Sequence, residues 1–373
     1  MFGRPLIIFL LGIISIAVVS FNNIFRRSNE INDNMIEYFL TETANNISQT
    51  GINMALRELE TDTTWRAGFN LEDTFGGKLR VRLVDTMYNL IRVIKVESVG
   101  ITNYGFDNEE VSLSIVYYDP WAFGFLPPNV LAAITTNNDV QTLGTLVVDG
   151  RNYDIDAISV PNTGTYAIWT TNNLERKGAS ELGSTESGID NEPAKVEDET
   201  VRLENQTYPG GLGFPSTPDL VMGGPAEGYS PGTLKSIALS GEGGSQYVTN
   251  PSSLTLPLSG VTFVELPSGD SWIDADISGS GVLIVHNSDN NAILKNLYGN
   301  FKGLLIIDDL IHIHATILGA VIALTPSPSD GNCIGNGEGT ILFSREAIKR
   351  GSAATVIEPS VSKSAEKVVA WWD

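Results

Sequence analysis

An uncharged segment near the N-terminus constrains this chain more than any other feature. It extends from Pro5 to Phe25 and is followed at once by Arg26 and Arg27. At a helical rise of about 1.5 Å per residue it would span about 30 Å, which is enough to cross the hydrocarbon core of a bilayer. The sequence therefore predicts one membrane anchor over residues 1–27, with the lipid bilayer as a partner.

A cleaved secretory signal is the alternative explanation of the same segment. In that case Arg4 forms the basic start, Leu6 to Val19 the apolar core, and the residues up to Ser20 a cleavage site of small residues. Both interpretations move the rest of the chain out of the cytoplasm. Basic residues flank the segment on both sides, so their count leaves the orientation open. We expect an inner-membrane-anchored protein whose bulk is periplasmic or on the cell surface.

Charge and composition exclude several classes of partner. The chain has 23 Lys and Arg against 44 Asp and Glu, a net charge of −21. Nucleic acid and anionic lipid surfaces would be repelled, so we expect no nucleic-acid partner. Cys333 is the only cysteine, which excludes an intrachain disulfide. The many glycines and the low charged fraction favour an α+β, mainly β, fold.

Residues 28–120 are predicted to form a stem helix and a small sheet. Apolar residues recur every three or four positions up to about Glu60, as in an amphipathic helix. Three alternating runs then follow, each typical of a half-buried strand: Lys78 to Asp85, Leu90 to Glu97 and Glu110 to Tyr117. We expect a three-stranded antiparallel meander whose apolar face is covered by the helix.

The remaining chain divides into three predicted segments. Residues 121–174 contain short β-rich runs. Residues 175–250 are predicted to be an excursion without regular structure, acidic at first and rich in Gly and Pro later. Residues 251–373 carry short β-branched strands and are predicted to form a right-handed parallel β-helix-like domain with a C-terminal cap. An antiparallel sandwich is the alternative. Ser344 to Arg350 is expected to be a short capping helix, and Trp371-Trp372 a final apolar plug or docking patch.

Three groups of residues could carry chemistry. His312 and His314 would share a strand face, and a stacked strand could bring His286 near them as a metal site. The loops Asp149–Asp156 and Asp330–Glu338 contain oxygen ligands for calcium, but neither has the full spacing of a calcium loop. Ordinary turn chemistry and solvent-facing histidines explain all of these residues, so we predict no metal site.

Carboxylates on a β-helix would also suit a polysaccharide lyase or hydrolase. Asp274 and Asp276 would share a face, whereas Asp308 and Asp309 would point in opposite directions. No basic residue or aromatic sugar platform accompanies them, and no known catalytic motif occurs. We therefore predict no catalytic and no cofactor-binding residue, no cofactor, and no enzyme.

Two parts of the sequence resemble a known family. The helix Glu37 to Leu59, directly after a single anchor, resembles the stem of PilX-like accessory (minor) pilins. The β-rich C-terminal runs, among them Ile317 to Ala323, look like the ectodomain that often follows in that group. Pilin precursors usually have a glycine followed by a Phe-Thr-Leu-Ile-Glu-like start, whereas here Arg4 and Pro5 follow Gly3.

The resemblance implies a membrane-anchored structural component of a type IV pilus, or of a related secretion or adhesion filament. Its partners would be other pilin-like subunits or pilus assembly proteins. A membrane-tethered β-helix enzyme acting on carbohydrate is the alternative function. A bactofilin-like structural polymer is a third, which the anchor and the long ectodomain disfavour.

Overall fold

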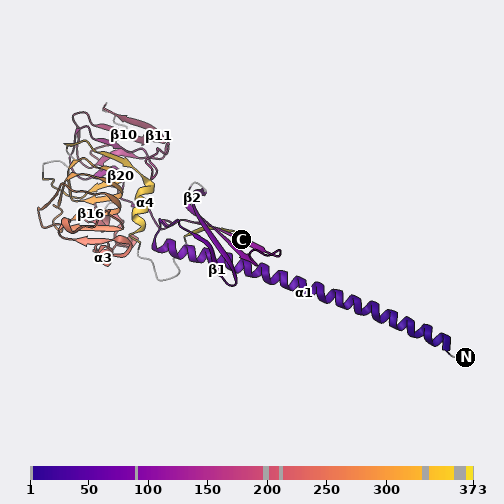
Figure 1. Cartoon of the computed structure of the whole chain (residues 1–373). Helices are drawn as coiled ribbons and strands as arrows, with labels where there is room; N and C mark the ends of the chain where they lie inside the picture. The colour runs from indigo at the N-terminus through magenta and orange to yellow at the C-terminus, as the bar shows by residue number, and fades with distance from the viewer. Residues whose placement is uncertain are drawn as a thin grey trace. The chain divides into compact units, whose positions relative to one another are not determined.

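The fold is α+β and mainly β, with one long N-terminal apolar helix and both antiparallel and parallel sheets (Figure 1). This computed structural model describes residues 3–88, 91–195, 201–209, 213–329, 336–356 and 367–372. The chain forms two compact units. Unit 1 comprises residues 1–120 and 360–373, and unit 2 comprises residues 121–359.

Unit 1 is built on a single uninterrupted helix, α1 (Gly3–Thr61). The predicted end near Glu60 is confirmed, and the anchor and stem are parts of one helix. Asp62 follows α1, and its carboxylate accepts the backbone N–H of Thr64, a turn that prevents further helix. Apolar residues on one face of the C-terminal part of α1, among them Ile47 and Leu59, are fully buried against a sheet.

The sheet of unit 1 has the strand order β1-β2-β3-β4-β23, with antiparallel neighbours throughout. The three strands predicted from alternation are β2, β3 and β4. The prediction of only three strands is wrong, because two more pair at the edges. The strands are β1 (Phe69–Thr74), β2 (Gly77–Tyr88), β3 (Ile91–Thr102), β4 (Glu110–Tyr118) and β23 (Val368–Trp372).

The edge strand β23 corrects the interpretation of the C-terminal residues. Trp371 pairs with Val116, and Trp372 pairs with Ile115, both in β4. The two tryptophans therefore belong to the sheet of unit 1 and are not a plug on the β domain. Alternation over five residues could predict a strand here, but it could not identify a partner about 250 residues earlier in the chain.

The strands of unit 2 form two sheets and pair in parallel, apart from the antiparallel pair β10 and β11. From β14 onward, even-numbered strands join a large sheet of order β11-β10-β7-β22-β20-β18-β16-β14-β13, and β15, β17, β19 and β21 join a smaller one of order β15-β17-β19-β21-β6-β9. Each strand thus pairs with the strand two further along the chain. The bounds of these strands are β13 (Gln246–Val248), β14 (Val261–Glu265), β15 (Ser271–Ile273), β16 (Gly279–His286), β17 (Ile293–Leu297), β18 (Asn300–Ile307), β19 (Asp309–Ile313), β20 (Thr316–Ala323), β21 (Asn336–Gly337) and β22 (Thr340–Phe343).

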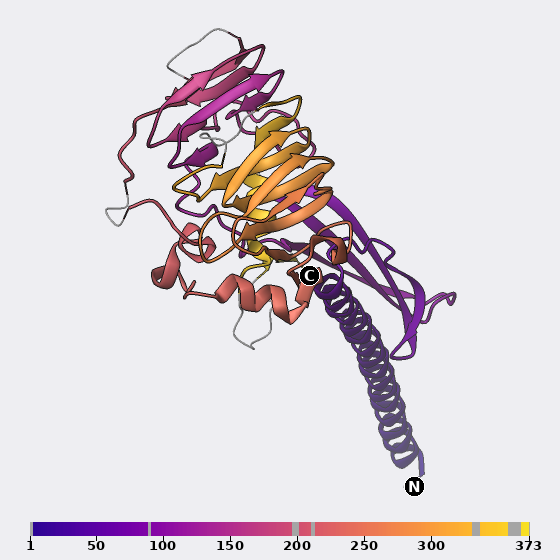
Figure 2. The same cartoon turned by 90° about the vertical axis from the view of Figure 1, so that its left-hand side faces the viewer.

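Residues 121–174 are part of the same sheets and not a separate β-rich segment. β20 pairs with β5 through Val321 and Ile134, β22 pairs with β7, and β21 pairs with β6. The strands that come first in the sequence of unit 2 therefore lie next to the strands that come last, in the same sheets (Figure 2). These strands are β5 (Ala132–Thr136), β6 (Val140–Gly144), β7 (Val147–Asp149), β8 (Tyr166–Thr170), β9 (Leu174–Arg176), β10 (Glu181–Glu186), β11 (Ile189–Ala194) and β12 (Arg202–Leu203).

The prediction of an irregular excursion over residues 175–250 is wrong for most of its described part. It contains β9 to β13, the helices α2 (Pro218–Val221) and α3 (Thr233–Ser240), and two 3-10 turns. In β10 the buried residues are mainly small and polar, so the strand is held by pairing with β7 and β11 and not by large apolar side chains. Its acidic residues lie at its two ends.

A column of glycines runs across three long strands of the large sheet. Gly281 pairs with Gly303, which pairs with Gly319, and all three have positive φ angles. A Cβ at Gly303 would lie 1.9 Å from the carbonyl oxygen of Gly281, so no side chain fits. The helix α4 (Arg345–Ala353), which confirms the predicted helix near residues 344–350, packs close by through Gly351.

Candidate functional site

The N-terminal part of α1 is the most exposed apolar surface among the described residues. The window that meets the length and composition of a membrane span is not buried by the rest of the chain. Its large side chains from Ile8 to Phe25 are about half to two-thirds exposed. Exposing so many apolar groups to water is unfavourable, so this helix is compatible with a membrane anchor.

N-terminal to the part that is buried under the sheet, the stem portion of α1 carries both polar and apolar exposed residues. Asp33, Ala44 and Ala55 are spaced by about three turns, and the two alanines are buried under the sheet. Met35 lies on a different side of the helix, because the residues three and six turns further along that side, Asn46 and Arg57, are both exposed. The sheet side of the helix is thus continued by Asp33 and also by Ile36, which lies three turns from buried Ile47. Exposed apolar residues occur at several positions around this part of the helix, namely Ile31, Met35, Ile36, Tyr38 and Phe39.

The loop Asp149–Asp156, which contains oxygen ligands of the kind that calcium binds, contains a buried ion pair. The carboxylate of Asp149 is fully buried and accepts hydrogen bonds from Arg151 Nη2 at 2.8 Å and from Tyr153 Oη at 2.6 Å. Glu192 pairs with the other side of the Arg151 guanidinium. Asp154 accepts the backbone N–H groups of two nearby residues, as in a turn. The carboxylates therefore do not converge on one point.

Electrostatics keep this buried cluster in one protonation state. Burial opposes the charge of Arg151, but its hydrogen bonds with Asp149 outweigh burial and raise the pKa of Arg151 above its ordinary value. Burial and the hydrogen bond to Asp149 both raise the pKa of Tyr153 well above its ordinary value. Arg151 stays charged and Tyr153 stays neutral at physiological pH, so the cluster is suited to holding the loop and not to proton transfer.

The three histidines do not come together. His286 Nδ1 lies 2.7 Å from Asp308 Oδ1, whereas His314 stacks on Tyr298. His312 has a left-handed backbone, with φ of 61°, so the strand alternation that would align it with His314 does not hold. Among the described residues no group of three or more His, Cys, Asp or Glu is placed to hold a metal ion.

His312 belongs instead to a column of left-handed residues in the smaller sheet. Asp274 and Asn296 also have positive φ angles. Asn296 donates to Asp274 Oδ1 at 2.9 Å, and its own Oδ1 lies 3.1 Å from His312 Nδ1. The side chains thus connect three successive strands, β15, β17 and β19, which explains these polar residues by structure.

The other candidate carboxylates also accept hydrogen bonds that stabilise the local structure. Asp276 accepts the backbone N–H of Ser278. Asp308 accepts the N–H groups of Asn287 and Ala292, and Asp309 accepts the N–H and hydroxyl of Ser329. The pair Asp274 and Asp276 and the pair Asp308 and Asp309 thus bind separate partners. Most of the loop Asp330–Glu338, with Cys333, lies outside the described residues.

One polar cluster has no counterpart in the sequence prediction. Lys235 Nζ donates to Glu265 Oε2 at 2.6 Å, and Tyr247 donates to the same oxygen. Burial opposes ionisation of Glu265, but these hydrogen bonds outweigh it and lower the pKa of Glu265 below its ordinary value. The hydrogen bond to Glu265 raises the pKa of Lys235. The three residues lie far apart in sequence, and only the pairing of β13 with β14 brings two of them together.

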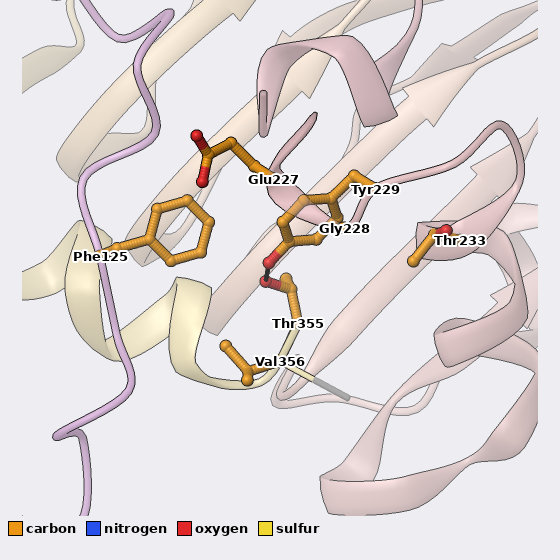
Figure 3. Close-up of a pocket in the computed structure, with 7 residues that line it drawn as sticks. All are labelled: Phe125, Glu227, Gly228, Tyr229, Thr233, Thr355 and Val356. Carbon is orange, nitrogen blue, oxygen red and sulfur yellow. Dashed lines mark hydrogen bonds between the residues drawn. The ribbon is translucent and has the colours of Figure 1, made fainter. Parts of the chain in front are cut away.

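The cavities of unit 2 that described residues line include two small ones. One, of about 280 Å³, is lined by Phe125, Glu227, Tyr229 and Thr355 among others (Figure 3). The Tyr229 hydroxyl pairs with Thr355 Oγ1 at 2.7 Å, so its polar end is already satisfied. The second, of about 250 Å³, is lined by Tyr208, Phe214 and neighbouring residues. Neither cavity gathers the carboxylates that the sequence singled out.

Comparison with known protein families, with curated proteins and with solved structures finds no match for this chain.

Proposed function

We propose that this chain is a membrane-anchored extracytoplasmic structural protein, a minor pilin-like component of a type IV pilus or of a related secretion or adhesion filament. One observation carries the proposal. A single helix is apolar and exposed over its N-terminal part and buried against an antiparallel sheet over its C-terminal part. That combination gives a protein that is held by a bilayer and presents a folded body beyond it.

We further propose that unit 2 is a right-handed parallel β-helix displayed by that anchor. The alternation of strands between two parallel sheets supports this, because each return to the same sheet is a parallel crossover. Such crossovers are right-handed in nearly all proteins. A β-helix offers a long rigid surface, which suits display or adhesion more than it indicates a reaction. A carbohydrate-active enzyme stays the alternative prediction, and turnover on a polysaccharide would favour it.

Membrane retention of the full chain in a Gram-negative host tests the anchor. The wild type should stay in the membrane pellet after alkaline carbonate extraction. Ile14→Arg places a charge near the middle of the apolar segment, at a cost of about 2.5 to 3.5 kcal/mol, and should release a large fraction. Asn32→Arg, outside that segment, is the matched control. Equal extraction of all three proteins would contradict the proposal.

Filament association is tested separately. In a host that assembles a pilus-like filament, the full chain should be found in the sheared surface fraction together with the major subunit. A chain that stays only in the inner membrane, with no filament subunit bound, would contradict the filament role but not the anchor.

A further inference from the structure

The cavity of about 280 Å³ in unit 2 is lined by three segments that are distant in sequence (Figure 3). Phe125 comes from the segment that precedes β5, and Thr355 and Val356 follow α4. The third segment begins at the end of the 3-10 turn η2 (Gly224–Glu227) and extends into α3. It contributes Glu227, Gly228, Tyr229 and Thr233 to the lining.

Hydrogen bonds hold these three segments together. The Phe125 N–H donates to Ser352 Oγ at 2.8 Å, and that hydroxyl donates to the Phe125 carbonyl oxygen at 2.6 Å. Ser352 is fully buried and belongs to α4. Tyr229 is also buried, and the hydrogen bond between its hydroxyl and Thr355 Oγ1 connects the third segment. The walls of the cavity are therefore in place before a ligand binds.

The one carboxylate in this lining, Glu227, has no counter-ion among the described residues. Its side chain is exposed and makes no hydrogen bond or ion pair with any of them. The described lining contains no Lys, Arg or His. An unpaired carboxylate at the wall of a small cavity attracts a cation, and the attraction is stronger where apolar walls exclude water.

The neighbouring helix end does not favour an anion. Thr233 begins α3, where backbone N–H groups would ordinarily attract negative charge. Here the buried carboxylate of Asp219 accepts the N–H of Gly232 at 2.8 Å and the N–H of Leu234 at 2.9 Å. The positive end of the helix is thus already neutralised, and the net charge of the whole chain is −21. The electrostatics of the cavity therefore favour a cation.

Two aromatic rings supply most of the apolar part of the lining. The ring centroids of Phe125 and Tyr229 lie 5.9 Å apart, and the rings are tilted by 39°. Burial raises the pKa of Tyr229, so its phenol stays neutral at physiological pH. Aromatic rings attract ammonium groups through their quadrupole, most strongly where water is excluded. A calcium ion is disfavoured, because it takes about six or more oxygen ligands and the lining offers one carboxylate.

We propose that this cavity binds the ammonium group of a small organic cation, with Glu227 as the counter-ion and Phe125 and Tyr229 as aromatic walls. The volume of about 280 Å³ lies just below the range of about 300 to 1,000 Å³ that is typical for drug-sized ligands. The ligand is therefore an alkylammonium group, as in a lysine side chain or a choline headgroup. This site goes beyond the proposed structural role and does not depend on it.

Ligand-observed NMR titration of the purified full chain in maltoside micelles tests the site, with empty micelles as the blank. The probes are n-butylammonium chloride and choline chloride, and n-butanol is the neutral analogue of the first. We expect saturable binding of at least one cation, at least about tenfold tighter than that of n-butanol. Tighter binding of n-butylammonium would assign the site to lysine side chains, and tighter binding of choline would assign it to quaternary headgroups. No saturable binding of either cation, or equal binding of n-butanol, would overturn the proposal.

Variants separate this site from a general attraction of cations to an acidic protein. Glu227→Gln should weaken cation binding at least about tenfold, and because this side chain is exposed the variant should unfold at the wild-type temperature. Glu242→Gln, at an exposed carboxylate outside the lining, should change binding less than about twofold. Phe125→Leu removes a ring and should weaken binding several-fold, whereas Tyr229→Phe keeps the ring and should leave binding unchanged. Equal weakening by Glu227→Gln and Glu242→Gln would mean that net charge alone attracts the cation and would overturn the proposal.

Discussion

The two units solve the same problem, which is to bury an apolar sheet face, in different ways. In unit 1 a helix covers the face, and four of the five strands follow one another along the chain. In unit 2 parallel strands enclose a core of their own side chains, and the early strands β7 and β10 come directly after the late strand β22 in the order of the same sheet. Unit 1 thus relies mainly on contacts between neighbours in sequence, whereas unit 2 relies on distant ones.

This difference has consequences for what each unit tolerates. A sheet under a helix can adjust when a side chain shifts, because the helix moves as a body. Stacked strands are closely packed on each other, so a displacement of the backbone in one strand displaces the next strand as well. Substitutions in unit 2 should therefore have larger effects on stability than those in unit 1.

The buried ion pair of unit 2 should be its most sensitive point. Asp149→Asn leaves the charge of Arg151 without its buried partner and should lower the free energy of unfolding by about 3 to 5 kcal/mol. Urea denaturation with a probe in each unit measures this. Glu192→Gln removes the exposed partner of the same arginine and should cost less than about 1 kcal/mol. Equal losses for the two substitutions would mean that burial does not determine how much each partner of Arg151 stabilises unit 2.

The two kinds of close glycine contact compare the units directly. Gly303→Ala forces a Cβ onto a backbone oxygen in the neighbouring strand and should cost about 2 to 3 kcal/mol. Gly51→Ala in α1 meets the side chains of Ser98 and Leu79, which can move, and the helix gains propensity. We expect a loss of about 1 kcal/mol or less for Gly51→Ala. Thermal unfolding measures both, and a reversed order would break the comparison.

The cap of α4 should have an intermediate effect. The hydroxyl of Ser344 accepts the N–H of Ala347 at 3.0 Å and is fully buried. Ser344→Ala should cost about 1 kcal/mol in the unfolding of unit 2. The control is Thr217→Ala, which removes a longer and exposed cap bond at α2 and should cost only a few tenths of a kcal/mol. No difference between the two would show that burial of the cap is unimportant.

The Lys235–Glu265 pair should give unit 2 a small dependence on pH. The pKa of Glu265 is lowered in the folded state, so its stabilisation is present above the pKa of the unfolded chain and is lost as pH falls through the folded value. Both side chains are about one-third exposed, so solvent screens the pair and the effect is below about 1 kcal/mol. In the wild type, the free energy of unfolding of unit 2 should decrease as pH falls from 6 to 3. Glu265→Gln should make this decrease smaller, as measured by urea unfolding across that range.

At alkaline pH, the contribution of Lys235 to the stability of unit 2 changes in the opposite direction. Its pKa is raised, so its contribution is present below the unfolded value and is lost as pH rises through the folded one. A decrease at acid pH that Glu265→Gln leaves unchanged would show that other carboxylates determine the pH dependence.

Local patterns predicted much of the fold. Periodicity of 3.6 found α1 and its end, and alternation found β2, β3 and β4. The glycine column also has a local signature, because Gly260, Gly281, Gly303 and Gly319 are each followed by mainly apolar residues. Aligning those four runs would have placed the strands of the large sheet in register.

Other features depend on distant partners, which no local pattern records. β10 has small polar residues and becomes a strand only because β7 and β11 flank it. The left-handed backbone at Asp274 and His312 breaks the alternation from which their side-chain directions were predicted. Among the described carboxylates considered for calcium or catalysis, Asp149, Asp274, Asp276, Asp308 and Asp309 accept hydrogen bonds from backbone N–H groups or from nearby side chains. The sequence alone could not distinguish this structural use from a site.

Protease accessibility tests the central claim, that α1 holds this chain in a membrane with both units outside the cytoplasm. Spheroplasts of a Gram-negative host expressing the full chain are treated with protease, and the mass of the membrane-bound N-terminal fragment is measured. We expect loss of both units and survival of a fragment that contains the Pro5–Phe25 segment. A full-length chain protected until the membrane is lysed would place both units in the cytoplasm and contradict it.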